Sequence, residues 1–176
     1  MGRIVAQTVG PRLGRTLLEL GGNNGVIVMD DANLDLALRA VLFGAAGTAG
    51  QRCTSTRRLF LQRGIASRLT AMLKAAYAQI RVGDPLDGTT LMGPLIDRAA
   101  VEAYRRALEE VKQAGGKVLC GGEVMDRPGK FVEPAIATAE NQWPIVQRET
   151  FAPSPSILPP TVLNAALLFQ KAVPPG

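Results

Sequence analysis

Cys53 is the residue whose type and neighbours most readily suggest chemistry. It follows a glycine-rich segment, residues 44–50, and a group of arginines lies near it in the sequence: Arg52, Arg57, Arg58 and Arg63. A thiolate is the reactive form of a cysteine, and nearby positive charge stabilises it. Two interpretations stay open from the residues alone. Cys53 is either a nucleophile or a structural cysteine in the core, where free cysteines are common.

Glu19 is the second residue whose position suggests chemistry. It stands near the end of an apolar segment, Thr16–Leu20, which is predicted to be a short strand, and it precedes Gly21 and Gly22. A carboxylate in apolar surroundings accepts a proton more readily and can serve as a general base near neutral pH. The alternative is an exposed charge at the end of a strand.

The chain contains no histidine, so no Ser-His or Cys-His dyad and no histidine zinc site can form within it. Cys53 and Cys120 lack the spacing of metal ligands, so no metal site is expected, and Cys120 is interpreted as core packing. The net charge of +5 comes without interleaved aromatic residues, so no nucleic-acid partner is expected. No apolar run is long enough for a membrane span, and no signal peptide is recognisable, so a cytoplasmic location without membrane contact is expected.

Periodic apolar residues indicate alternating strands and helices. Leu34, Leu38, Val41 and Leu42, for example, fall on one face of a helix. The predicted strands are residues 26–29, 58–61, 117–120 and 131–136, and the predicted helices are residues 34–42, 69–80 and 97–114. This alternation favours an α/β fold with a largely parallel sheet.

Three short segments resemble the signatures of the aldehyde dehydrogenase family. Leu18–Gly22 is similar to its glutamate signature, Gly50–Thr54 to its cysteine signature, and Glu149–Pro153 to its Glu-x-Phe-x-Pro segment. They occur in the family's order and at its spacing. Residues 22–28 and 50–59 most resemble the α-aminoadipic semialdehyde dehydrogenase branch of the family.

The resemblance implies a fold and a reaction. The expected fold is the catalytic domain of that family, a three-layer α/β sandwich with a mostly parallel sheet, in incomplete form. The substrate would be a small aldehyde, which Cys53 would attack to give a thiohemiacetal. Hydride would pass to NAD or NADP and leave a thioester, which water activated by Glu19 would hydrolyse.

The resemblance also assigns the binding residues. Glu149 would bind the ribose on the nicotinamide side, Phe151 would pack against the cofactor, and Gly2 and Leu20 would belong to the same site. The alternatives are a solvated loop charge for Glu149 and a core aromatic for Phe151. Arg52 would pair with a substrate carboxylate, as in a semialdehyde acid, or would form a structural salt bridge.

The resemblance covers residues 1–153, which are expected to form a partial catalytic domain. Residues 154–176 are expected to be a divergent, proline-rich and loosely held tail with a short apolar helix at Val162–Phe169. The chain is expected to be truncated at both ends. NAD is therefore expected to bind weakly or not at all, since the glycine turn that holds the pyrophosphate would lie upstream.

Two other functions stay open. One is a truncated, non-catalytic homologue that keeps the fold and binds a partner. The other is a cysteine esterase that uses Cys53 and Glu19 without a cofactor. Full-length relatives are homo-oligomers, and the oligomeric state of this chain is left open.

Overall fold

The fold is built on a five-stranded sheet. The computed structural model describes residues 1–161, and it describes their side chains as far as Leu158. The strands are β1 (Asn24–Val28), β2 (Thr56–Gln62), β3 (Lys117–Cys120), β4 (Ile136–Thr138) and β5 (Ser156–Thr161), in the spatial order β1-β2-β5-β4-β3. The pairs β1–β2, β2–β5 and β5–β4 are parallel, and only β3 runs antiparallel to its neighbour.

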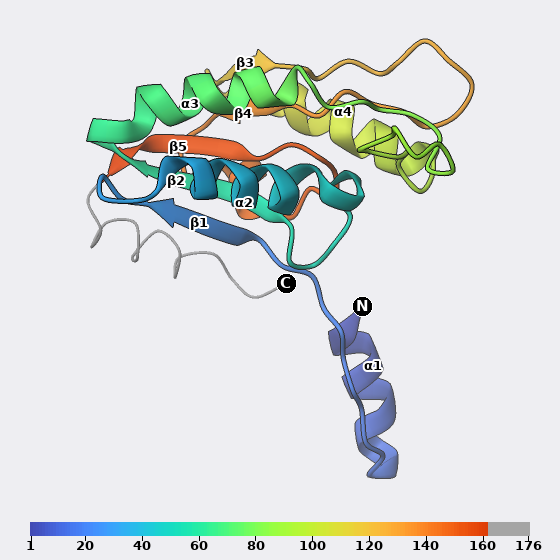
Figure 1. The fold of residues 1–176 in the computed structure, drawn as a ribbon. Coiled ribbons are helices and arrows are strands. Elements are labelled where there is room, and N and C mark those ends of the chain that lie inside the picture. Colours follow the sequence, from blue (N-terminus) through green and yellow to red (C-terminus); the bar gives the residue numbers. More distant parts are fainter. Residues whose placement is uncertain (162–176) are drawn as a thin grey trace.

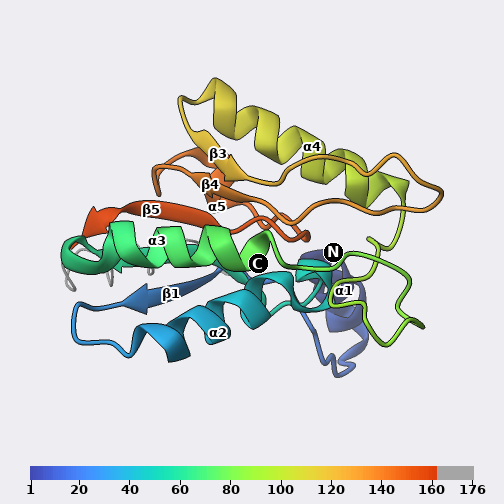
Figure 2. The same cartoon turned by 45° about the horizontal axis from the view of Figure 1, so that its top comes forward.

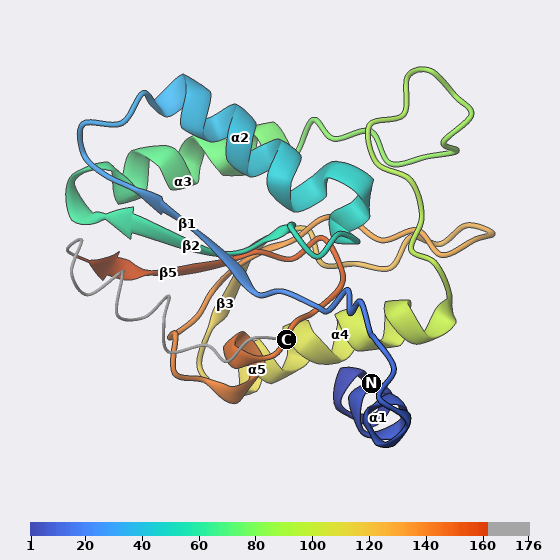
Figure 3. The ribbon, with the colours of Figure 1, turned by 90° about the horizontal axis from the view of Figure 1, so that it is seen from below.

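Helices cover both faces of this sheet. The helices are α1 (Gly2–Val9), η1 (Gly10–Arg12), α2 (Leu34–Ala46), η2 (Gly47–Gly50), α3 (Arg63–Tyr77), α4 (Arg98–Gln113) and α5 (Pro144–Gln147). Figure 2 shows α2 and α3 side by side, and Figure 3 shows α4 and α5 on the opposite face. Helix α1 extends away from the body (Figure 1). The predicted three-layer α/β sandwich with a mostly parallel sheet is confirmed.

Strand β2 shows how the layers are held together. Its first six residues are buried. Leu59 and Leu61 pack in the cluster under α2 and α3, whereas Phe60 packs in the cluster under α4 and α5. Successive side chains of a strand point to opposite faces, so a strand with both faces covered must be apolar at consecutive positions. Cys120 packs at the edge of the first cluster, in agreement with its interpretation as a packing residue.

Side-chain caps begin two of the predicted helices. The side chain of Asn33 accepts a hydrogen bond from the backbone N–H of Leu36, and that of Asp97 accepts one from Ala100. Such caps satisfy backbone donors that have no partner within the helix. The helices predicted at residues 34–42 and 97–114 are confirmed as α2 and α4.

Two strand predictions are wrong. Residues 14–23 form no regular structure, and the side chain of Leu17 is 85% exposed, because no neighbouring strand pairs with this segment. The strand predicted at residues 131–136 is displaced, since β4 begins only at Ile136. Pro134 has no N–H to donate to a ladder, which accounts for the interruption before β4.

The prediction of a loosely held chain after Pro153 is wrong for Ser156–Thr161. This segment is β5 and lies between β2 and β4. Ile157 packs in the cluster on the α2–α3 face and Leu158 in the cluster on the α4–α5 face, so the segment is held from both sides. The helix predicted at Val162–Phe169 lies outside the described residues. The division of the chain at Pro153 stays a prediction.

Candidate active site

The three motif segments each lie directly before one of three adjacent parallel strands. Residues 18–22 precede β1, residues 50–54 precede β2, and residues 149–153 precede β5. Parallel neighbours run in the same direction, so the chain enters all three strands at the same end of the sheet. Segments far apart in the sequence therefore meet at the amino ends of β1, β2 and β5.

The cysteine loop is a tight, left-handed turn between α2 and β2. Thr48, Ala49 and Gly50 have φ angles of 56°, 51° and 67°. Non-glycine residues rarely adopt such angles, and they do so mostly where the surrounding structure enforces them. The Cys53 side chain that follows is exposed, which excludes the alternative of a structural cysteine in the core. The loop thus presents its thiol at the surface of the described chain.

The glutamate segment packs directly against this loop. A methyl group on Gly22 would collide with the carbonyl oxygen of Cys53, so the two backbones touch at this point. Asn24 donates from its side-chain amide to the carbonyl oxygens of Cys53 and Ser55, at 2.5 and 3.2 Å. The beginning of β1 therefore fixes the backbone on either side of Thr54.

Glu19 lies three residues before Gly22, in the exposed segment that leads to β1. None of the hydrogen bonds or ion pairs within residues 1–158 includes its carboxylate. The structure therefore brings the backbone near Glu19 to the cysteine loop. The Glu19 side chain itself has no hydrogen-bond or ion-pair partner within residues 1–158.

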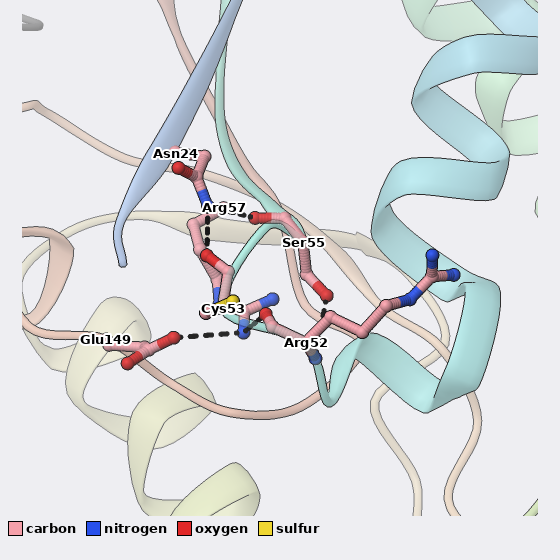
Figure 4. Close-up of polar contacts among 6 residues, drawn as sticks. All are labelled: Asn24, Arg52, Cys53, Ser55, Arg57 and Glu149. Atoms are coloured by element: carbon pink, nitrogen blue, oxygen red, sulfur yellow. Dashed lines mark hydrogen bonds and ion pairs between the residues drawn. The ribbon is translucent and has the colours of Figure 1, made fainter. Parts of the chain in front are cut away.

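Arg57 is a site residue that the sequence analysis did not single out beyond its charge. Its Nη2 donates to the carbonyl oxygen of Arg52 at 3.1 Å and to Oε1 of Glu149 at 3.4 Å. Its guanidinium also lies 5.4 Å from the centre of the Phe151 ring. Figure 4 shows this guanidinium beside Cys53 and joined by a dashed line to Glu149. The available signal was the pair of consecutive arginines, Arg57 and Arg58, directly before the apolar run Leu59–Leu61.

Burial and neighbouring charges shift the pKa of Arg57 in opposite directions. Only 4% of its side chain is exposed. Burial lowers the pKa of the Arg57 guanidinium, and the charge of Glu149 and its hydrogen bond, together with the charge of Cys53, counteract that shift. Arg57 is therefore a buried cation with the carboxylate of Glu149 against it.

Arg58 has a different set of partners. Its Nε and Nη2 donate to the carbonyl oxygen of Asn23 at 3.1 and 2.7 Å, and its Nη1 donates to Oδ1 of Asn141 at 3.1 Å. Burial lowers the pKa of Arg58 as well. Arg58 thus ties the segment before β1 to the loop before α5.

The residues assigned to a cofactor occupy two places. Glu149 keeps 22% of its side chain exposed, and a methyl group on Gly21 would collide with its Oε2. Phe151 is 44% exposed and lines, with Glu149, a cavity of about 290 Å³ against α4. Phe151 is therefore not a core aromatic. Gly2 lies against the side chain of Leu20, where an added Cβ would come within 2.8 Å of Cδ2.

Arg52 points away from this cluster. Its guanidinium lies over the ring of Phe43, 4.8 Å from the centroid, and Figure 4 shows the side chain running toward α2. Among the ion pairs of residues 1–158, none involves Arg52, so the alternative of a structural salt bridge finds no support there.

Two further properties concern ligands and membranes. Among the described residues, no group of three or more His, Cys, Asp or Glu side chains could hold a metal ion. The helices within residues 1–161 are too short or too polar to cross a bilayer.

Comparison with known proteins gives the family. The model of the aldehyde dehydrogenase family matches residues 1–168. Alpha-aminoadipic semialdehyde dehydrogenase of Mus musculus is 53% identical over 154 residues, which are 87% of this chain and 29% of that protein. Aldehyde dehydrogenase family 7 member A1 of Pisum sativum is 43% identical over 176 residues, 100% of this chain and 35% of that protein.

A solved structure agrees with this assignment. Betaine aldehyde dehydrogenase from Staphylococcus aureus, in complex with NAD+, superposes with a TM-score of 0.89 at 29% identity, over 96% of this chain and 35% of that chain. The chain belongs to the aldehyde dehydrogenase family. It spans about a third of the length of the curated relatives that it matches.

Proposed function

We propose that this chain carries the thiol site of an NAD(P)-dependent aldehyde dehydrogenase, which oxidises an aldehyde to a carboxylic acid. The observation that carries the proposal is the meeting of the cysteine loop, the Glu19 segment and the Glu149 segment at one end of the sheet. Relatives named as semialdehyde and betaine aldehyde dehydrogenases support the same chemistry.

Cys53 would act as the nucleophile. Its exposed sulfur attacks the carbonyl carbon of the aldehyde and forms a thiohemiacetal, whose oxyanion is stabilised by the backbone N–H of Cys53. A bound cofactor would supply the acceptor for the hydride whose loss turns the thiohemiacetal into a thioester on Cys53. Glu19 then removes a proton from water, which hydrolyses the thioester and releases the acid and the free thiol.

Glu149 and Phe151 suit a nicotinamide cofactor. The Glu149 carboxylate is partly exposed and is held by Arg57 on one side only, so an oxygen is available to accept hydrogen bonds from ribose hydroxyls. Phe151 exposes part of its ring for an apolar contact. Gly2 and Leu20, which touch each other, are proposed as further contacts of the cofactor.

Arg52 would select the substrate. Its guanidinium has no carboxylate partner within residues 1–158, and an arginine of this kind can bind a carboxylate through two hydrogen bonds. The side chain runs away from Cys53 (Figure 4). This geometry suits a semialdehyde acid whose carboxylate is separated from its aldehyde by several carbons.

The test is NAD(P)H formation from semialdehyde acids, with nitrophenyl ester hydrolysis measured in parallel. Cys53→Ala should abolish both activities, whereas the matched change Cys120→Ala should retain them, because Cys120 packs at the edge of the core. NAD(P)H formation that survives Cys53→Ala would contradict the proposal. Ester hydrolysis alone would favour a cysteine esterase, and neither activity would favour a non-catalytic homologue.

A further inference from the structure

We infer that Arg57 is a positioning residue that holds the carboxylate of Glu149 and the backbone of the cysteine loop in one arrangement, with its positive charge beside Cys53. The inference deepens the proposed function, because it takes from that proposal the roles of Glu149 and Cys53. It adds a residue that lies in none of the three motif segments.

The geometry of Arg57 supports this role. It is the second residue of β2, and one of its nitrogen atoms, Nη2, contacts both segments. That atom donates to the carbonyl oxygen of Arg52, the residue directly before Cys53, and to Oε1 of Glu149. The Phe151 ring lies over the same guanidinium. A single side chain therefore joins the cysteine loop to the segment that would bind the cofactor.

The burial of Arg57 is not explained by packing. Its side chain is almost fully buried, and its Nε and Nη1 have no hydrogen-bond partner within the described part of the chain. Burying a cation with unpaired donors is unfavourable, and an apolar residue would fill such a strand position at lower cost. The charge is therefore better explained by what it touches, namely Glu149 and the surroundings of Cys53.

Arg58 provides an internal comparison. It is also buried in β2, where its guanidinium donates hydrogen bonds to Asn23 and Asn141 and lies over the ring of Phe60. Adjacent residues of a strand point to opposite faces, which explains why the two arginines have different partners. A change at Arg58 should therefore disturb the fold without removing the charge that faces Cys53.

The loss of Arg57 has two expected consequences. Glu149 would lose the one ion-pair partner that it has within residues 1–158, so its carboxylate would take up several orientations. The sulfur of Cys53 would lose a neighbouring cation while the anionic Glu149 stays near, so its surroundings would attract negative charge less. The first effect raises KM for the cofactor, and the second slows reactions of the thiol.

The experiment measures the rate of Cys53 alkylation by iodoacetamide at neutral pH, in a Cys120→Ala background where Cys53 is the remaining cysteine. Arg57→Met should slow alkylation about tenfold, and Arg57→Lys should restore most of the rate because it returns the charge. Arg58→Lys is the matched control. It should lower the thermal midpoint and leave the alkylation rate within about twofold.

Cofactor binding gives the second measurement. Both Arg57→Met and Arg57→Lys should raise KM for NAD(P)+, since lysine cannot reproduce the planar arginine contacts. If Arg57 had a purely structural role, the two variants would be less stable without this increase in KM. Arg57→Gln, which keeps a donor for the Arg52 carbonyl, decides the alkylation question if the methionine variant does not fold.

Unchanged alkylation in a folded Arg57→Met or Arg57→Gln variant would overturn the inference. Alkylation needs neither aldehyde nor cofactor, so the two proposals fail separately. Absent aldehyde oxidation with slowed alkylation would reject the proposed function and keep Arg57 as a positioning residue for the thiol. Normal aldehyde oxidation with unchanged alkylation would keep the proposed function and reject Arg57 as a positioning residue for the thiol.

Discussion

The side-chain amide of Asn24 donates a 2.5 Å hydrogen bond to the carbonyl oxygen of Cys53, and so joins the first residue of β1 to the loop that carries the thiol. The same amide reaches the carbonyl oxygen of Ser55. Backbone carbonyls in a turn next to a sheet need such donors, because the sheet ladder does not supply them there. Asn24 thereby sets the direction from which Cys53 enters the site.

Replacing Asn24 tests this relationship. Asn24→Ala should lower the free energy of unfolding by about 1–3 kcal/mol, since it leaves two carbonyl oxygens without their donor. Asn24→Asp has nearly the same shape and no amide donor, so it should be destabilised at least as much. Urea denaturation measures both changes. An aspartate variant as stable as the original protein would show that the amide hydrogen bonds do not hold the loop.

Gly21→Ala should disturb the cofactor carboxylate selectively. The added methyl group would collide with Oε2 of Glu149 and force that side chain to move. We expect KM for NAD(P)+ to rise about tenfold or more, while ester hydrolysis by Cys53 changes little. Gly88→Ala is the control, because a Cβ there meets no atom within 4 Å. Equal effects of the two substitutions would argue against a specific contact with Glu149.

Tyr77 and Tyr104 form a natural pair for comparing a satisfied and an unsatisfied hydroxyl. The Tyr104 hydroxyl donates to the carbonyl oxygen of Glu133, whereas the Tyr77 hydroxyl is buried with no partner in the described structure. Tyr104→Phe should cost about 1 kcal/mol of stability, and Tyr77→Phe should be neutral or stabilising. Urea denaturation of both variants gives the comparison. A loss at Tyr77 as large as that at Tyr104 would indicate a bound water at its hydroxyl.

The same tyrosines predict a loss of stability at alkaline pH. Burial raises the pKa of Tyr77 and of Tyr104 above the ordinary value of about 10. Above that pH the unfolded chain releases protons that the folded chain keeps, so their contribution is complete below about pH 10 and falls as the pH rises further. Each tyrosine adds a slope of up to about 1.4 kcal/mol per pH unit.

Unfolding free energies measured between about pH 9 and pH 11 test this expectation. The double variant Tyr77→Phe with Tyr104→Phe should flatten the profile, because phenylalanine does not titrate. A profile equally steep in that variant would assign the alkaline loss to other groups.

Local signals predicted much of the fold. Asn33 and Asp97 mark helix starts in the sequence because a cap acts on residues directly after it. The apolar run Leu59–Leu61 predicts a strand, and the structure has one there, buried on both faces. These features depend on a few consecutive residues, and the structure has them where the sequence predicts them.

Other features depend on contacts between distant residues. The apolar residues before Gly21 resemble a strand, yet no neighbouring strand is available to pair with them. The prolines after Pro153 suggest a loop, yet the gap between β2 and β4 accepts Ser156–Thr161 as a strand. Arg57 lies against Glu149 because β2 pairs with β5 in the sheet. No local sequence pattern predicts that pairing.

The central place of β5 has a consequence for the synthesis of the protein. The strand from residues 156–161 joins the pair β1–β2 to the pair β4–β3, which have no direct contact as neighbours in the sheet. A ribosome releases β1 and β2 long before it releases β5, the strand that joins them to β4 and β3. Pairing over such sequence distances is slow and leaves strand edges unprotected in the meantime. The nascent chain should therefore depend on chaperones until β5 emerges.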